Sequence, residues 1–222
     1  MKYNFDQIIS RRETHSTKWL KFSDAEVIPM WIADMDFLCP SEITKPMIQR
    51  IDEGVFGYTD TPQSLTDTFI EKTKSNTGWQ IDKDWVVWVP GGVVGLNVAC
   101  KTVLAPGDMA MVPSPIYAPF TEAPENMERG FVKTYLKDSN GRLEFDFDEI
   151  RTLLSEDTKL LFLCNPHNPG GSVFSQEELI ELSRLCEENG VIVCSDEIHS
   201  DLVLDEGLKH IPFATINKHN QE

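Results

Sequence analysis

Several side chains capable of ligand chemistry stand just beyond apolar runs of this sequence, within five residues of the end of the run. They are Tyr117 after DMAMV (108–112), Asn165 after KLLFLC (159–164), and Asp196 and His199 after VIVCS (191–195). An amide can donate to a ligand oxygen, a carboxylate can bind a cationic or donating group, and an aromatic ring can lie against a flat cofactor. Packing is the alternative interpretation of Tyr117, and a structural ion pair is the alternative interpretation of Asp196.

The stretch LLFLCNPHNPGG (160–171) joins an apolar run to two Asn-Pro pairs and two glycines. Pro166 and Pro169 fix their own φ and hold the residues before them extended, which predicts a rigid bend. Asn165 projects from the end of the run with a donor for a ligand oxygen. An Asx turn would explain one Asn-Pro pair but would leave the repeated pair a coincidence. His167 is expected to lie at the surface.

The glycines of PGGVVG (90–95) follow the apolar run DWVVWV (84–89). Glycines that open a helix leave its first amides bare, and these amides together with the helix dipole favour a phosphate. A plain tight turn explains the same glycines equally well. The stretch is neither a P-loop nor a GxGxxG fingerprint, so both interpretations stay open.

The stretch SDEIHSDL (195–202) gathers several acidic side chains around a histidine. Asp, Glu and His are suitable metal ligands, which makes a metal-dependent hydrolase a distant alternative built on Asp196, Glu197, His199 and Asp201. Their spacing matches no established metal signature. No metal site is therefore predicted.

Short apolar runs alternate with amphipathic stretches, and this alternation predicts the elements that must position these side chains. Strands are expected at 84–89, 108–112, 130–136, 159–164 and 191–195, and helices at 64–76, 91–104, 147–154 and 175–189. Ser64 is a candidate N-cap, and Ser175 with Glu178 forms a candidate capping box. The pattern predicts an α/β fold with a mostly parallel sheet covered by helices on both faces. Ligands of such sheets bind beyond the carboxyl ends of the strands.

The beginning of the chain differs from this pattern. Prolines and a lack of regular periods over the first 45 residues predict an N-terminal arm with part of a small domain over 1–45. The alternating elements then predict a large domain over 46–222.

Composition limits the classes of binding partner and the cellular compartment that can be expected. The 20 basic and 36 acidic residues give a formal net charge of −16, which repels nucleic-acid phosphates and anionic lipid. The sequence shows no signal-peptide pattern and no apolar stretch near the ~20 residues of a membrane span, so a cytoplasmic location is expected. The five cysteines are odd in number and widely spaced, and they are expected to be buried thiols.

Seven stretches carry a resemblance that covers essentially all 222 residues. In order they are FDQIISRRETHSTKW, WIADMDF, FGYTD, PGGVVGL, PSPIYAPF, CNPHNPGG and SDEIHSDL. Together they resemble the pyridoxal 5′-phosphate (PLP)-dependent enzymes of the aminotransferase superfamily, fold type I, class I/II. The first three point to the cystathionine β-lyase-like C–S lyase branch. The resemblance implies a three-layer α/β/α PLP-binding large domain, incomplete at its C-terminus.

The resemblance also implies roles for the strand-end residues. Asp196 would pair with the protonated pyridine nitrogen, Asn165 would donate to the phenolic oxygen, and Tyr117 would lie against the ring. His199 is placed with them among the cofactor-binding residues. The bend at 165–171 would then be stiff because the ring that it grips must not tilt during the reaction.

The phosphate and the subunit arrangement follow from the same resemblance. The backbone amides near Gly92, Val93 and Val94 would hold the cofactor's phosphate. Tyr58 would reach the phosphate of the neighbouring subunit's cofactor, so the active unit would be a homodimer.

The implied reaction is α,β-elimination on an S-linked amino acid such as cystathionine, giving a thiol, pyruvate and ammonia. Transamination on the same scaffold is the alternative, although WIADMDF favours the lyase. The family's chemistry needs a lysine that forms the Schiff base with the cofactor. Lys209 and Lys218 lack the expected setting, so no catalytic residue is assigned and the lysine is expected beyond Glu222. The sequence therefore predicts either the N-terminal part of a longer lyase or a non-catalytic PLP-binding or interaction protein.

Overall fold

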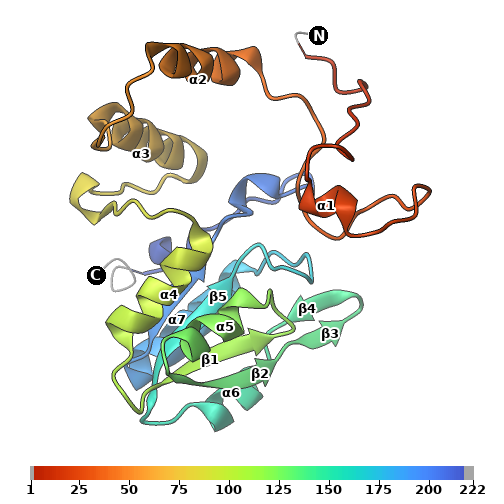
Figure 1. The fold of residues 1–222 in the computed structure, drawn as a ribbon. Helices are drawn as coiled ribbons and strands as arrows, with labels where there is room; N and C mark the ends of the chain where they lie inside the picture. Colours follow the sequence, from red (N-terminus) through yellow and green to blue (C-terminus); the bar gives the residue numbers. More distant parts are fainter. Residues whose placement is uncertain (1–2, 218–222) are drawn as a thin grey trace. The chain divides into compact units, whose positions relative to one another are not determined.

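The computed structural model describes residues 3–217, and the chain divides into two compact units. Unit 1 comprises Met1–Asp60 and unit 2 comprises Thr61–Glu222. The domain boundary expected after residue 45 falls inside helix α2 (Ser41–Glu53), which belongs to unit 1. Figure 1 shows unit 1 in red to orange and most of unit 2 in yellow to blue.

Unit 1 is built around a charged network and has only two helices among its described residues, α1 (Thr17–Leu20) and α2. The Arg11 guanidinium binds both carboxylate oxygens of Asp34, at 2.8 and 2.9 Å, and also Asp36 at 2.9 Å. The buried Lys18 donates to the same Asp36 at 2.7 Å. Because the lysine and the indole N–H of Trp19 both donate to it, the pKa of Asp36 falls to about 2.

The core of unit 2 is a four-stranded parallel sheet with the strand order β2-β1-β5-β6. Its strands are β1 (Met109–Ser114), β2 (Gly130–Tyr135), β5 (Thr158–Cys164) and β6 (Ile192–Asp196). The strands expected at 108–112, 130–136, 159–164 and 191–195 are thus confirmed. Every side chain of β5 except Lys159 is buried, as expected for a central strand covered on both faces.

Helices cover both faces of this sheet (Figure 1). Helices α4 (Gly92–Val103) and α5 (Pro119–Asn126) pack on one face, where the Phe120 ring of α5 meets the Phe162 ring of β5 edge to face at 5.5 Å. Helices α6 (Phe147–Leu153) and α7 (Gln176–Asn189) pack on the other face. This arrangement confirms the predicted α/β fold with a sheet between two helical layers.

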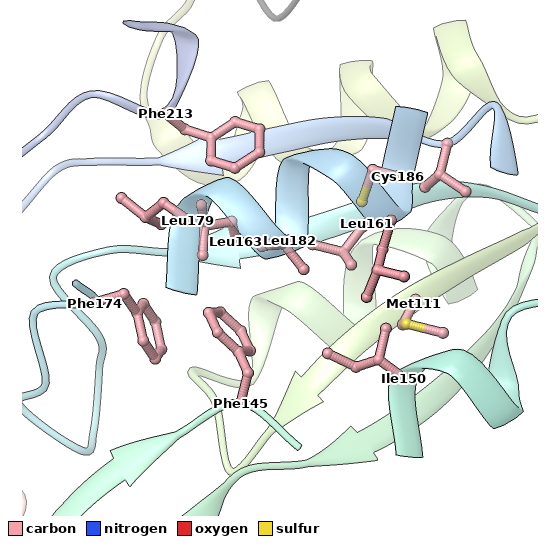
Figure 2. Packing of buried hydrophobic residues seen from close by; sticks show 12 residues of the cluster. Met111, Phe145, Ile150, Leu161, Leu163, Phe174, Leu179, Leu182, Cys186 and Phe213 are labelled. Carbon is pink, nitrogen blue, oxygen red and sulfur yellow. The ribbon is translucent and has the colours of Figure 1, made fainter. Parts of the chain in front are cut away.

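The second face holds the larger apolar cluster, shown in Figure 2. Alternate residues of β5, Leu161 and Leu163, point into it, while α7 contributes Leu179 and Leu182. Phe145 and Phe174 stack at 4.1 Å at one end of the cluster. Burial of this apolar surface is the main force that holds α7 to the sheet.

The predicted capping box of α7 is confirmed. The Ser175 side chain accepts from the Glu178 N–H, and the Glu178 side chain accepts from the Ser175 N–H. Two free N–H groups at the helix start are thereby satisfied. Gly190, with φ of 63°, ends the helix in the left-handed conformation that glycine adopts at low cost.

The strand expected at 84–89 is wrong. Lys83–Trp85 form the 3-10 helix η1, and residues 86–89 pair with no strand among residues 3–217. A strand needs a hydrogen-bonded neighbour, and here the Val87 side chain is 78% exposed. The candidate N-cap Ser64 is also wrong, because α3 (Gln63–Thr77) begins one residue earlier, after the extended Pro62.

The remaining elements connect these layers. They are the antiparallel hairpin β3 (Lys137–Ser139) and β4 (Arg142–Glu144) and the 3-10 helices η2 (Ser200–Leu202) and η3 (Phe213–Thr215). All five cysteines are free thiols. Cys100, Cys164 and Cys186 are buried as expected, whereas Cys39 is exposed.

Candidate functional site

The candidate site lies at the carboxyl edge of the parallel sheet. Cys164, the last residue of β5, pairs in register with Asp196, the last residue of β6. Strand β1 runs parallel to β5 and ends at Ser114, so the loop that carries Tyr117 leaves from the same edge. Polar groups from three loops therefore meet where ligands of α/β sheets bind.

Helix α4 directs its N-terminus to this edge. Its last residue, Val103, connects to the start of β1 through a short turn closed by the Asp108 N–H and the Ala105 carbonyl at 3.1 Å. The helix therefore runs antiparallel to β1, and its length of about 18 Å matches a six-residue strand of about 20 Å. Its first amides consequently lie at the carboxyl edge of the sheet.

The glycines that open α4 leave its N-terminus uncovered. Gly91 is the N-cap residue, with φ of 114° and no side-chain cap. A Cβ atom added at Gly91 or Gly92 would meet no atom within 4 Å. The amides of Gly92, Val93 and Val94 have no acceptor inside the helix, and both valine side chains are exposed. Such a helix start can bind an anionic group.

Asn165 is completely buried at the start of the rigid bend. Its N–H donates to the Asp196 carbonyl at 3.0 Å, and its side-chain oxygen accepts from the Phe174 N–H at 3.1 Å. Its Nδ2 atom is buried and has no hydrogen-bond partner among the described residues. Its exposed fraction is 0%, so a ligand at the surface of the sheet edge does not reach it in this arrangement.

Asn168 lies on the same bend and is partly exposed. Its carbonyl accepts from the Tyr117 N–H at 3.2 Å, and its own N–H contacts the Cys164 sulfur at 3.4 Å. Tyr117 is 48% exposed. The structure thus brings Tyr117 together with Asn168, whereas the sequence favoured Asn165 because it is the first polar residue after the apolar run.

His167 is buried, with an exposed fraction of 4%, so the expectation of a surface histidine is wrong. Its Nδ1 atom accepts from the Gly170 N–H at 3.2 Å. A Cβ atom at Gly170 would lie 2.7 Å from this Nδ1 atom and 2.5 Å from Leu143. The double glycine was the sequence signal for this burial, because Gly170 lacks the Cβ atom that would occupy the space of the imidazole.

Asp196 is partly buried, and its carboxylate accepts from the Ile198 N–H at 3.0 Å. No salt bridge involves it among the described residues, so the alternative of a structural ion pair is not what the structure shows. Burial raises the pKa of Cys164 to about 11 and that of Cys194 to about 12, with the Asp196 charge as a smaller contribution. Both thiols are therefore protonated near neutral pH and are poor nucleophiles.

The other residues of the 196–201 stretch turn to separate partners. Glu197 accepts from Ser195 Oγ and the Phe213 N–H and binds His210, each at 2.8 Å. Asp201 pairs with Lys72 at 2.5 Å. His199 is partly buried and precedes η2, where its carbonyl accepts from the Leu202 N–H. Within residues 3–217, no three His, Cys, Asp or Glu side chains gather as a metal site would require.

Tyr58 belongs to unit 1 and follows α2. Its side chain is fully exposed in that unit. Its predicted contact with a neighbouring subunit stays a prediction.

A cavity of about 780 Å³ lies elsewhere in unit 2. Residues of α3, β6, 197–203 and 208–214 line it, including Lys72, Asp201 and His210. Strand β6 is the edge strand of the described sheet, so this cavity lies beside that edge and extends to Glu197, just after the end of β6. Neither Tyr117 nor Asn168 lines it, and we place the candidate site at the strand ends because the polar groups converge there.

Comparison with known proteins gives consistent matches along the chain. A family model described as aminotransferase class I and II matches residues 25–219. Cystathionine beta-lyase PatB from Bacillus subtilis (strain 168) is 41% identical over 219 residues, which cover 96% of this chain and 56% of that protein.

Two solved structures are similar in fold as well as in sequence. OvoB is 41% identical with a TM-score of 0.92, covering 98% of this chain and 57% of that structure. The PLP-bound C-S lyase from Staphylococcus hominis is 36% identical with a TM-score of 0.88, covering 96% of this chain and 56% of that structure. The chain thus spans little more than half the length of these relatives. None of the helices among residues 3–217 has both the length and the apolar character needed to cross a membrane.

Proposed function

The chain belongs to the aminotransferase class I and II family, and from this premise we propose that it forms the cofactor-binding part of a PLP-dependent carbon–sulfur lyase. The observation that carries the proposal is the convergence at one sheet edge of Asp196, the exposed Tyr117 ring and the open N-terminus of α4. These are a carboxylate, a flat ring and an anion site. PLP offers a pyridine nitrogen, a flat ring and a phosphate, so the residues present fit the cofactor.

Each group at the edge would have a distinct task. Asp196 would keep a proton on the pyridine nitrogen. The hydrogen bond that its carboxylate accepts from the Ile198 N–H orients this carboxylate. Tyr117 would lie against the ring, and the bare amides of α4 would bind the phosphate. His199, the residue after Ile198, would bind near the same ring. When bound, PLP supplies the electron sink for a carbanion at the substrate Cα.

We further propose that Asn168, rather than Asn165, donates to the phenolic oxygen of the cofactor. Asn165 is inaccessible, and its amide oxygen is used to hold the backbone at Phe174. Asn168 is partly exposed and is hydrogen-bonded through its backbone to Tyr117. Asn165 would then stabilise the bend from inside while Asn168 meets the ligand.

The reaction proposed for the whole protein is α,β-elimination on an S-linked amino acid, with a thiol, pyruvate and ammonia as products. The identity to a cystathionine beta-lyase and to a C-S lyase supports this choice. Aminotransfer is the second candidate, and the description of the matching family favours it. A homodimer in which Tyr58 contacts the partner's cofactor is part of the same proposal.

The test of the reaction uses the protein purified from its natural source and supplied with PLP and cystathionine. Release of pyruvate without an added keto acid would support elimination. Amino exchange that requires a keto acid and releases no pyruvate would contradict it and favour the aminotransferase. Loss of either activity on substitution of Asp196, with an unchanged fold by circular dichroism, would link the reaction to the sheet edge.

A further inference from the structure

The buried His167 makes three hydrogen bonds within its own turn. Its backbone N–H donates to the Ser172 carbonyl at 2.8 Å, and its carbonyl accepts from the Gly171 N–H at 2.7 Å. Its Nδ1 atom accepts from the Gly170 N–H at 3.2 Å. Main chain and side chain of one residue therefore close the turn from 167 to 172.

The imidazole is suited to this acceptor role because it is neutral. Burial lowers the pKa of His167 below its usual value near 6.5, so the ring carries a single proton near pH 7. Nδ1 accepts a hydrogen bond, which leaves the proton on Nε2. Nε2 is buried and has no hydrogen-bond partner within the part of the chain that the structure describes.

The turn that His167 closes carries the contact between two loops of the candidate site. Asn168 is its next residue, and the Asn168 carbonyl accepts from the Tyr117 N–H at 3.2 Å. The backbone of Pro115, on the Tyr117 side of this contact, lies close enough to His167 to raise its pKa in part. His167 is thus hydrogen-bonded within the bend at 165–171 and lies near the loop that holds Tyr117.

We propose that His167 is a positioning residue that closes the 167–172 turn through Nδ1 and thereby fixes Asn168 against Tyr117. Tyr117 and Asn168 are the ring contact and the amide of the proposed PLP site, so the importance of His167 for cofactor binding depends on the proposed function. The effect of His167 on the turn itself does not depend on that function. The two can therefore be separated by experiment.

The experiment measures amide hydrogen exchange of the 222-residue chain by NMR in two variants. His167→Leu removes the acceptor, whereas His167→Asn keeps a side-chain oxygen at the position of Nδ1. We expect the Tyr117 and Gly170 amides to exchange at least about tenfold faster in His167→Leu, since an unmade buried hydrogen bond has effects of this size. We expect His167→Asn to restore most of the protection. The amides of α6, a helix outside both the 167–172 turn and the Tyr117 loop, serve as the internal control for general loss of stability.

A substitute is available for the leucine variant if it does not fold. In His167→Gln the amide reaches the position of Nε2 instead of Nδ1, and the same faster exchange at Tyr117 is expected. Unchanged protection of Tyr117 in the variants that lack the acceptor would overturn the inference. An equal loss of Tyr117 protection in His167→Asn would also overturn it, because an acceptor at the position of Nδ1 would then have no effect on the turn.

The dependence on the proposed function is read from a PLP titration of the same samples. Weaker binding in His167→Leu than in His167→Asn supports the positioning of the cofactor site. If the unsubstituted chain binds no PLP, the proposed function fails, and the exchange of the Tyr117 amide still decides whether His167 positions the turn.

Discussion

The two asparagines of the bend should differ in what their removal does. Asn165→Ala leaves the Phe174 N–H without its acceptor in a site that water does not reach. An unsatisfied buried group of this kind costs about 1–3 kcal/mol. Part of this loss is offset because the unpaired Nδ2 atom of Asn165 also disappears. We therefore expect Asn165→Ala to lower the free energy of unfolding by about 1–2 kcal/mol, in the lower part of that range, which is still a large share of the stability of a typical domain.

Asn168→Ala should leave stability nearly unchanged and weaken cofactor binding. The side chain is partly exposed, and the contact to Tyr117 uses the backbone carbonyl, which alanine keeps. Its free energy of unfolding should change by less than about 0.5 kcal/mol. Loss of one donor to the cofactor should weaken PLP binding by roughly 2- to 13-fold, the equivalent of about 0.5–1.5 kcal/mol.

Urea unfolding and PLP titration of both variants provide the comparison. The reasoning predicts that Asn165→Ala loses stability and that Asn168→Ala loses affinity. The reverse result, with Asn165→Ala fully stable yet unable to bind PLP, would refute it. In that case the donor to the cofactor would be the buried asparagine, and the bend would have to open on binding.

Two further predictions concern the backbone at α4 and the charge network of unit 1. Gly91 has φ of 114°, a backbone conformation that alanine adopts only with strain. Gly91→Ala should therefore lower the free energy of unfolding in urea by about 1–3 kcal/mol, whereas Gly92→Ala, where an added Cβ meets no atom within 4 Å, should lower it far less. Equal losses in the two variants would contradict the strain argument. The pKa of Asp36 is lowered to about 2, so its contribution to the stability of unit 1 is present above the unfolded pKa near 3.9 and is lost as the pH falls through about 2. The NMR signal of the Trp19 indole N–H, which donates to Asp36 at 2.8 Å, should therefore titrate near pH 2, and a midpoint near pH 4 would be inconsistent with the network.

The central part of the fold could be predicted from the sequence because its signals are local. Helix α7 carries its own capping box and apolar stripe, and β5 is an uninterrupted apolar run, so each needs only a sheet and a helix layer to pack against. The alternation of such elements also predicts that ligand groups meet at the carboxyl edge. Asp196 and Tyr117 were selected on this basis, and the structure brings them to that edge.

The failures have a different physical origin. The run at 84–89 has the composition of a strand. A strand forms only where a second strand pairs with it, and that partner can lie far away in the sequence. None of the described strands pairs with 84–89. Burial inside the bend is likewise a tertiary property. The prolines predict that 165–171 is rigid, but they do not show which of its polar side chains face inward, and both Asn165 and His167 do so.

The central claim is that the carboxyl edge of this sheet binds PLP, with Asp196 on the pyridine nitrogen. Its most direct test is an equilibrium titration of the chain with PLP, followed by absorbance, for the unsubstituted protein and for Asp196→Asn. We predict saturable binding that weakens about 10- to 150-fold in Asp196→Asn, since a charge-assisted hydrogen bond contributes about 1.5–3 kcal/mol. Saturable binding of equal strength in both proteins would contradict the claim, as would no saturable binding to the unsubstituted chain.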